Sequence, residues 1–214
     1  MSQIVGVVSQ KGGVGKSTLS RLLAAAYSGS GWSVLIADLD TSQATSTDWV
    51  VRRNEAQVEP AVQAQPFRNI AQALKSSLPY DLVIFDGPPH SQAGTLEIAK
   101  ASQAVFLPTG LALDDLRPGI RLAHELVEAG IPKDKIAFVL CRAGDRAGEI
   151  EEAREYIQVA SYQAIKGAIP EKTAFRRASD EGRTLAEVSF PTLREKAEEV
   201  LDGMIQFITA RGNQ

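Results

Sequence analysis

Short runs of apolar residues alternate along the whole chain with longer segments in which apolar residues recur every three or four positions. Some runs, such as Leu82-Val83-Ile84-Phe85, are apolar at consecutive positions, which is typical of strands covered on both faces. This alternation predicts a doubly wound, mostly parallel α/β sheet with helices on both faces. We expect seven strands, at Gln3–Ser9, Ser33–Ala37, Ala61–Ala64, Asp81–Phe85, Ala104–Leu107, Lys135–Leu140 and Gln163–Ala168.

The amphipathic segments between these strands predict the helices. The segment from Thr41 to Pro66 is rich in Ser, Thr, Gln and Ala, and we expect a helix within it. Because no Pro/Gly/Ser-rich linker divides the 214 residues, we predict a single domain over residues 1–214. The expected helices are Lys16–Ser28, Asp48–Glu55, Phe67–Ser77, Leu113–Ala129, Glu149–Ser161 and Thr192–Ala210.

The composition narrows the class of protein. Hydrophobic residues make up 44% of the chain and charged residues 23%, which is ordinary for a folded domain. The single cysteine, Cys141, excludes an internal disulfide and a cysteine-rich metal or iron–sulfur site. The first residues lack a basic region and a cleavage site, and no apolar run reaches the length of a membrane span, so we expect a cytoplasmic protein. The net charge of −3 means that any contact with DNA must come from a local basic patch.

The segment from Gln10 to Thr18 carries the strongest chemical signal. It contains three glycines and Gly15-Lys16-Ser17, and it lies between the first predicted strand and the first predicted helix. In this context the backbone N–H groups of a glycine-rich loop and the helix N-terminus bind phosphates. The segment therefore predicts a P-loop NTPase, with Lys16 on the β- and γ-phosphates and Ser17 on Mg²⁺. The loop residues expected to bind the nucleotide are Gly12, Gly13, Val14, Gly15, Lys16, Ser17 and Thr18.

An additional lysine, Lys11, precedes the paired glycines. With it, the loop resembles that of the deviant Walker A ATPases, the superfamily of the ParA and MinD partition and positioning proteins. The resemblance implies that two ATP-bound protomers form a nucleotide-sandwich dimer in which Lys11 reaches the partner's ATP. The simpler alternative is that Lys11 is a solvated loop lysine.

Acidic residues follow two of the predicted strands. Asp38 and Asp40 come after the second strand, and Asp86 comes after the fourth, before Gly87-Pro88-Pro89. Strand ends of an open parallel sheet form the ligand-binding edge. The resemblance implies that Asp40 positions the attacking water, that Asp38 lies near Mg²⁺ and that Asp86 holds Mg²⁺ as the Walker B residue. The alternative for Asp38 and Asp40 is that they cap the next helix.

Two further loops should reach the nucleotide. The resemblance implies that the loops after the sixth and seventh strands frame the base, which selects Arg142, Pro170 and Glu171.

Between residues 166 and 183, five basic residues outnumber three acidic ones, and the resemblance implies nonspecific DNA binding there. A mixed-charge solvated helix is the alternative. The five residues are Lys166, Lys172, Arg176, Arg177 and Arg183.

Together these features predict a small ParA-type partition ATPase with no room for an N-terminal helix-turn-helix. Its cofactors would be ATP and Mg²⁺. Its partners would be a second copy of itself, nonspecific DNA of the nucleoid and a ParB-like centromere-binding or adaptor protein that stimulates hydrolysis. The alternatives are an ATPase that positions a protein cargo and a MinD-like membrane-associated ATPase. The membrane alternative is disfavoured because the last helix carries acidic residues on its polar face.

Overall fold

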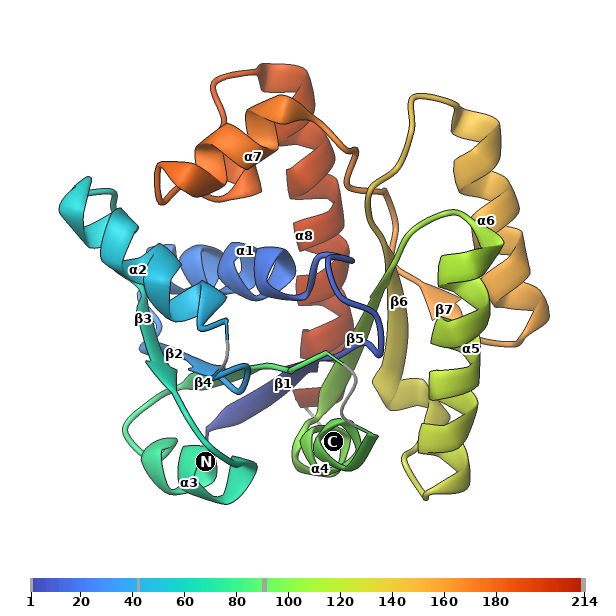
Figure 1. The fold of residues 1–214 in the computed structure, drawn as a ribbon, viewed down its shortest axis with the longest axis horizontal. Helices are drawn as coiled ribbons and strands as arrows, with labels where there is room; N and C mark the ends of the chain where they lie inside the picture. Colours follow the sequence, from blue (N-terminus) through green and yellow to red (C-terminus); the bar gives the residue numbers. More distant parts are fainter. Residues whose placement is uncertain (1, 42, 90–91, 213–214) are drawn as a thin grey trace.

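A computed structural model describes residues 2–41, 43–89 and 92–212 (Figure 1). At its centre lies one seven-stranded sheet in the order β3-β2-β4-β1-β5-β6-β7. Every pair of neighbouring strands is parallel. The predicted fold class is therefore confirmed. The strands are β1 (Gln3–Val7), β2 (Val34–Asp38), β3 (Gln63–Pro66), β4 (Leu82–Asp86), β5 (Ala104–Thr109), β6 (Ile136–Leu140) and β7 (Gln163–Ala164).

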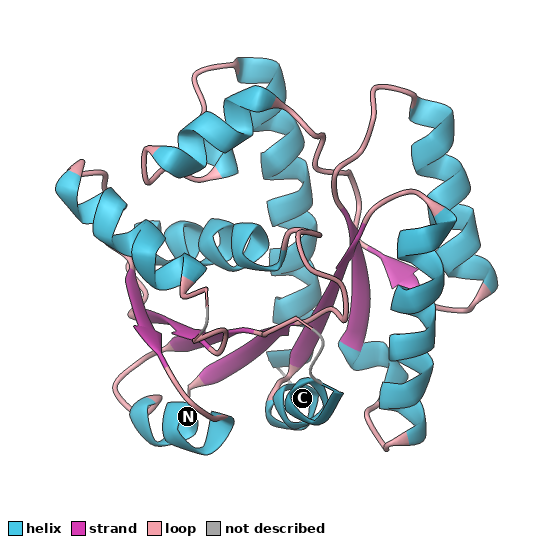
Figure 2. Cartoon of the chain, in the orientation of Figure 1, coloured by secondary structure: helices cyan, strands magenta, loops and turns pink. Residues whose placement is uncertain are grey.

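Helices cover both faces of this sheet (Figure 2). One face is covered by α1 (Lys16–Gly29), α2 (Thr45–Glu55), α7 (Thr173–Asp180) and α8 (Pro191–Gly212), and the other by α3 (Ile70–Ser76), α4 (Gln92–Ala101), α5 (Leu113–Glu128) and α6 (Ala147–Val159). Two 3₁₀ turns, η1 (Lys133–Lys135) and η2 (Leu185–Glu187), complete the described elements.

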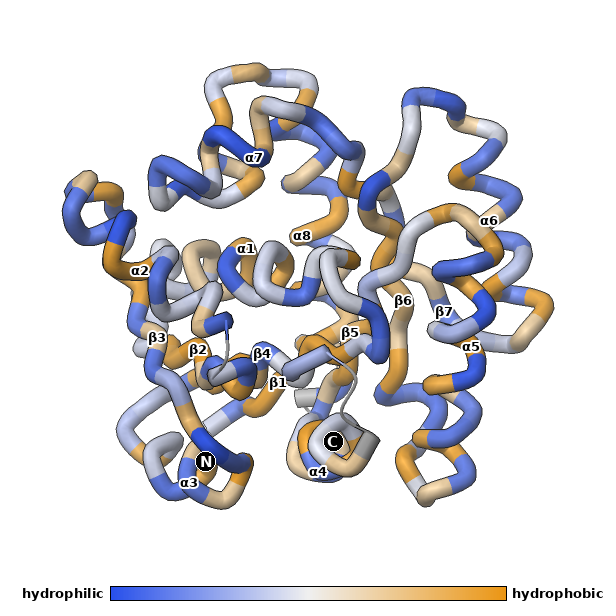
Figure 3. The backbone as a smooth tube through the Cα atoms, in the orientation of Figure 1, coloured by the Kyte–Doolittle hydropathy of each residue, from blue (hydrophilic) through white to orange (hydrophobic). Residues whose placement is uncertain are grey.

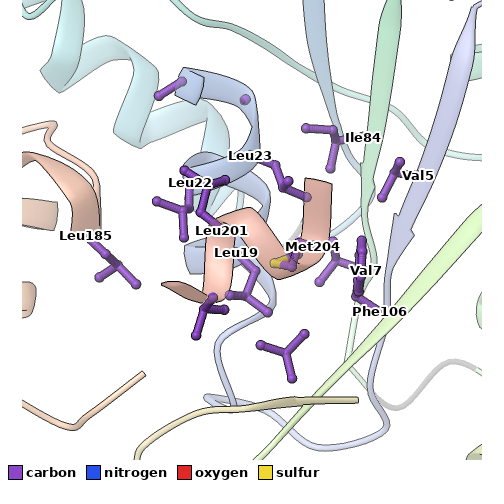
Figure 4. Packing of buried hydrophobic residues seen from close by; sticks show 14 of the residues in the cluster. Val5, Val7, Leu19, Leu22, Leu23, Ile84, Phe106, Leu185, Leu201 and Met204 are labelled. Carbon is purple, nitrogen blue, oxygen red and sulfur yellow. The ribbon is translucent and has the colours of Figure 1, made fainter. Parts of the chain in front are cut away.

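The strands β2, β4, β5 and β6 are fully buried because alternate residues point into two different hydrophobic cores. In β4, for example, Leu82 and Ile84 belong to the core under α1 and α8, whereas Val83 and Phe85 belong to the core under α4 and α5. Figure 3 shows the resulting concentration of hydrophobic residues along the central strands. Figure 4 shows the first core, in which side chains of β1, β4 and β5 meet those of α1 and α8.

The last helix belongs to this first core. Its residues Ala197, Val200, Met204 and Ile208 are fully buried against the sheet, as the spacing of apolar residues predicts. Among the described residues, none of the helices is both long and apolar enough to span a membrane.

Among the differences from the sequence predictions, those at β7, α4, α7 and α2 matter most for the site. The seventh strand ends at Ala164 rather than Ala168, because the chain turns at Gly167, which has a φ of +79°. Two helices were not predicted, α4 and α7. The helix α2 begins at Thr45, three residues before the predicted start, and this earlier first turn contributes to the site described below.

The topology gathers the candidate residues at one edge. The loops that follow β1, β2, β4, β6 and β7 all leave the carboxyl end of a parallel sheet, and the strand order reverses between β1 and β5. Such an edge is where open α/β sheets bind ligands. The phosphate loop, the three aspartates and the loops after β6 and β7 are therefore neighbours in space.

Candidate functional site

The phosphate loop runs from the end of β1 into α1. Gly13 has a φ of +72° and Gly15 a φ of +111°, a region that side chains other than glycine rarely adopt. A Cβ at Gly15 would also lie 3.2 Å from the Cys141 Sγ. Val14 is buried, so it can offer a ligand only its backbone. The predicted glycines thus give the loop the backbone shape that α1 needs to begin at Lys16.

A cleft of 570 Å³ opens above this loop. It brings together the phosphate-loop residues, Asp40 and the three residues predicted to frame the base. Cavities of this size accommodate a small ligand. Its lining includes Gly12, Gly13, Gly15, Lys16, Ser17, Thr18, Asp40, Arg142, Pro170 and Glu171.

Lys16 is buried at the base of the cleft. Its Nζ donates a hydrogen bond of 3.3 Å to the carbonyl oxygen of Lys11, which folds the loop over the ammonium group. Burial lowers the pKa of Lys16, and the nearby carboxylates of Asp86 and Asp40 act in the opposite direction. This ammonium group is consequently held in place for an anionic ligand.

Lys11 points elsewhere. It does not line the cleft, and its Nζ forms an ion pair with Asp115 in the first turn of α5. Its backbone N–H donates to the Ser9 hydroxyl at 3.1 Å, and the neighbouring Gln10 amide donates to Glu125 of α5 at 3.2 Å. The Asp115 carboxylate fits because residue 110 is glycine, whose absent Cβ would lie 2.2 Å from it. The start of the loop is thus fastened to α5, and the Lys11 ammonium group is paired outside the cleft.

Replacing Asp115 tests whether this ion pair competes with the predicted contact of Lys11 with the partner's ATP. Because the pair is partly exposed, its loss should change the free energy only by about 0.2–1 kcal/mol. Because both protomers lose this pair, we expect Asp115→Asn to tighten dimerisation driven by ATP by up to about 30-fold in analytical ultracentrifugation. Asp114→Asn, at the preceding position, serves as the control. Weaker dimerisation in the Asp115 variant would show that Asp115 supports the lysine rather than restrains it.

Asp38 is buried and acts as a cap. Its Oδ2 accepts hydrogen bonds from the backbone N–H groups of Ser46 at 3.0 Å and Thr47 at 3.2 Å, in the first turn of α2. Its Oδ1 accepts one from the N–H of Asp40 at 3.2 Å. The N-cap residue Ala44 offers no side-chain oxygen, so Asp38 takes over the capping of α2. These bonds are those that the capping alternative expects, and the place of Asp38 near Mg²⁺ stays a prediction.

Asp86 differs from Asp38 because one of its oxygens is left over. The Oδ2 atom accepts a hydrogen bond of 2.6 Å from the Ser46 hydroxyl, whereas the buried Oδ1 has no hydrogen-bond partner among the described residues. Burial raises the pKa of Asp86 to about 6, although the hydroxyls of Ser46 and Ser17 lower it. An orphaned carboxylate oxygen beside the Ser17 hydroxyl fits a hydrated Mg²⁺.

The described residues contain no group of three or more His, Cys, Asp or Glu side chains that could hold a metal by themselves. Mg²⁺ is commonly bound through one or two carboxylates together with waters and phosphates. The residues present therefore fit an ion that enters with a nucleotide.

Asp40 faces the cleft from the loop after β2. Its Oδ1 accepts a hydrogen bond of 3.3 Å from the Gln43 N–H, and its charge acts on Lys16. This places Asp40 on the phosphate side of the cleft, where the sequence predicts a catalytic carboxylate. Part of this loop, Ser42, lies outside the described residues.

The loops after β6 and β7 are joined to each other. Arg142 forms an ion pair of 3.2 Å with Glu171, and Ala143 pairs with Pro170 as an isolated β-bridge. Lys172 is paired with Asp145 at 2.7 Å. The structure therefore builds one wall of the cleft from the two loops that the sequence selects for the base.

This geometry agrees with a family match. The family model described as "CobQ/CobB/MinD/ParA nucleotide binding domain" matches residues 5–185. The chain belongs to this family. The matched range includes the phosphate loop, the three aspartates and the loops that frame the cleft, so the resemblance to ParA and MinD proteins is confirmed for the part of this CobQ/CobB/MinD/ParA domain that carries the candidate site.

Two curated relatives of this CobQ/CobB/MinD/ParA member carry different names. "Maintenance of carboxysome distribution protein A" of Gloeobacter kilaueensis is 28% identical over 195 residues, 90% of this chain and 88% of that protein. "Chromosome-partitioning ATPase Soj" of Thermus thermophilus is 27% identical, over 92% of this chain and 94% of that protein. Both relatives therefore match this chain nearly end to end.

The fold has solved counterparts. The MinD protein of Pyrococcus horikoshii, solved with Mg-ADP, has a TM-score of 0.73 at 19% identity, covering 99% of both chains. The fold is therefore that of MinD, and the nucleotide and metal in that structure agree with the predicted cofactors, ATP and Mg²⁺.

The basic residues predicted for DNA do not form one patch in this family member. Lys172, Arg176 and Arg183 line the nucleotide cleft, whereas Lys166 lies on another surface, paired with Glu199. Four of the five are paired with acidic side chains, and among the described residues only Arg177 of the five has no ion pair. Their role in binding DNA stays a prediction.

Several residues of the site could not be found from motifs. Arg21 of α1 lines the cleft, and its Nη1 donates to the Ser179 hydroxyl of α7 at 3.1 Å. Ser46 joins α2 to Asp86. Arg21 and Ser46 give little signal in the sequence because an isolated arginine or serine in a helix is usually structural. The contact of Arg21 with Ser179 was also hidden because α7 was not predicted.

Proposed function

We propose that this protein is a ParA-type positioning ATPase that binds Mg²⁺·ATP, forms a nucleotide-sandwich dimer and hydrolyses ATP when a partner protein stimulates it. The observation that carries the proposal is the placement of the two lysines of the loop. Lys16 lies inside the cleft, and Lys11 lies outside it, on the far side of the loop. A lysine in that position can serve a second protomer more readily than its own phosphate site.

The roles of the residues follow from their places. The loop amides and Lys16 would hold the phosphates. Ser17 would bind Mg²⁺, and the Oδ1 atom of Asp86 would hold the ion through a bound water. Bound Mg²⁺ would neutralise charge on the phosphate oxygens. Asp40 orients the attacking water, and Lys11 of the opposite protomer stabilises the charge that develops on the phosphates. Hydrolysis is thereby coupled to dimerisation.

The cargo can be proposed as a broad class, because the two curated relatives are named for different cargoes. One curated relative is named for carboxysome distribution and the other for chromosome partitioning. We propose that the ATP-bound dimer binds nucleoid DNA in the cytoplasm without sequence preference and positions a cargo upon it. A plasmid, a chromosome or a protein assembly fits this role, and a ParB-like centromere-binding protein or an adaptor would stimulate release.

A membrane-positioning function is a weaker candidate. The apolar residues of α8, the helix that could otherwise lie on a bilayer, are buried in the core beside α1. This burial argues against a role of α8 in binding lipid.

The proposal is tested by measuring ATP-dependent binding to nonspecific DNA and to anionic liposomes at two salt concentrations. We expect DNA binding only with ATP, falling steeply with salt because phosphate contacts release counterions. Arg177→Ala should weaken it, whereas Arg146→Ala, an exposed arginine on the flank of α6, is the matched control. Binding to liposomes without binding to DNA would overturn the partition function and favour the membrane alternative.

A further inference from the structure

The first turn of α2 lies against the metal side of the nucleotide site. Thr45, its first residue, lines the cleft, and its Oγ1 lies 2.9 Å from the Oγ of Ser17. Ser46 follows and donates to Asp86, and Thr47 donates to Asp38. Three consecutive residues of α2 therefore contact the three residues of the predicted metal site, Ser17, Asp86 and Asp38.

We propose that the Thr45 hydroxyl is a second protein ligand of Mg²⁺, beside that of Ser17. The proposal rests on the binding of Mg²⁺·ATP proposed above. In octahedral coordination with bonds of about 2.0–2.1 Å, neighbouring ligand oxygens are about 2.9 Å apart. The two hydroxyls form a hydrogen bond with each other, and their oxygens already have this separation. One ion could bind both without a movement of either helix.

Thr45 is held in this position by a buried arginine. The Nη2 of Arg21 donates to the carbonyl oxygen of Thr45, its Nη1 donates to Ser179 and its Nε donates to Ser46 at 3.4 Å. Arg21 is 8% exposed, so these bonds are shielded from water. The start of α2 is thus fixed to α1, the helix that carries Ser17.

Ser46 determines which oxygen of Asp86 remains available. By donating to Oδ2 at 2.6 Å, it leaves the buried Oδ1 as the atom without a partner. That oxygen is suited to accept a hydrogen bond from a water on Mg²⁺, because Mg²⁺ keeps several of its waters. Ser46 is accordingly a positioning residue, and Thr45 is the ligand.

The consequence is a link between the metal and the loop of Asp40. The segment from Asp40 to Thr45 would have one end at the γ-phosphate side of the cleft and the other on Mg²⁺. Binding of Mg²⁺ at Thr45 would therefore act on the segment that carries Asp40, the residue proposed above to orient the attacking water.

The test is the dependence of ADP affinity on Mg²⁺, measured with a fluorescent ADP in Mg²⁺ and in EDTA. Thr45→Val keeps the shape of the side chain and removes the hydroxyl. We expect affinity to fall roughly tenfold in Mg²⁺, as for loss of a metal-site partner, and to stay unchanged in EDTA. Thr45→Ser should restore it, and Thr209→Val, at an exposed position of α8 far from the cleft in sequence, should leave the ratio of the two affinities unchanged.

Mn²⁺ in place of Mg²⁺ provides a direct readout. Electron paramagnetic resonance in ¹⁷O-labelled water counts the waters on Mn²⁺, and the Thr45→Val complex with ADP should hold one more than the original protein. An unchanged number of waters, or equal losses of affinity in Mg²⁺ and EDTA, would overturn the ligand role. Failure of the original protein to bind Mg²⁺·ADP at all would instead refute the proposed function.

Discussion

Lys11→Ala is expected to abolish dimerisation driven by ATP and to reduce ATP hydrolysis by at least about 100-fold. A cation supplied in trans to a phosphoryl-transfer site can contribute 10³- to 10⁵-fold in rate, so this bound is conservative. Nucleotide binding by the monomer should persist, because Lys11 lies outside the cleft and its Nζ is paired with Asp115. Light scattering with a non-hydrolysable ATP analogue and a steady-state hydrolysis assay measure the two effects.

The matched control is Lys75→Ala, an exposed lysine of α3. It should dimerise and hydrolyse ATP as the original protein does. Dimerisation of the Lys11→Ala variant with undiminished affinity would show that the lysine is a solvated loop residue, and would remove the main reason for a nucleotide-sandwich dimer.

Arg53→Met is expected to lower the free energy of unfolding by about 3–5 kcal/mol, because it leaves the acid paired with Arg53 without its partner. The Arg53 side chain is fully buried, and both Nη atoms bond to Glu187, at 2.8 and 2.7 Å. The same guanidinium donates to the carbonyl oxygens of Gly182 and Pro60, each at 2.9 Å. It therefore ties α2 to the segments before β3 and after α7.

Urea unfolding measures this loss, and Arg68→Met, at an exposed position, is the control. Adding Glu187→Met to Arg53→Met should recover part of the stability, since no unpaired charge then remains. A loss below about 1 kcal/mol for Arg53→Met alone would mean that water replaces the arginine's bonds, as at surface ion pairs.

The sequence predicted most of the sheet because its strands are apolar at consecutive positions. Leu82-Val83-Ile84-Phe85 is unambiguous, since both of its faces are buried. The helix α7 was missed because Thr173–Asp180 buries only Phe175 and Ala178, and two apolar residues give too little periodicity. The seventh strand was too long in the prediction because Gly167 in the run Gln163–Ala168 was not recognised as a turn.

The site was predictable to the extent that its residues lie in contiguous motifs. The phosphate loop and Asp86 could be read directly, whereas the bonds of Asp38 to α2 depend on where that helix begins. The ion pair of Lys11 with Asp115 joins residues 104 positions apart, and no local pattern encodes it. The basic residues from 166 to 183 could be counted but not oriented, and in the structure they face different surfaces and acidic partners.

Mixing two inactive variants, Lys11→Ala and Asp40→Ala, tests whether Lys11 acts on the nucleotide of the opposite protomer. In a mixed dimer, the Lys11→Ala protomer keeps its own Asp40 and receives Lys11 from its partner, so one of its two sites is complete. Random pairing sets the upper limit at about one quarter of the original ATPase activity, and the recovered activity should lie below it because the mixed dimer contains only one Lys11. Two affinity tags verify that mixed dimers form. If such a mixture stays as inactive as either variant alone, Lys11 does not act across the dimer.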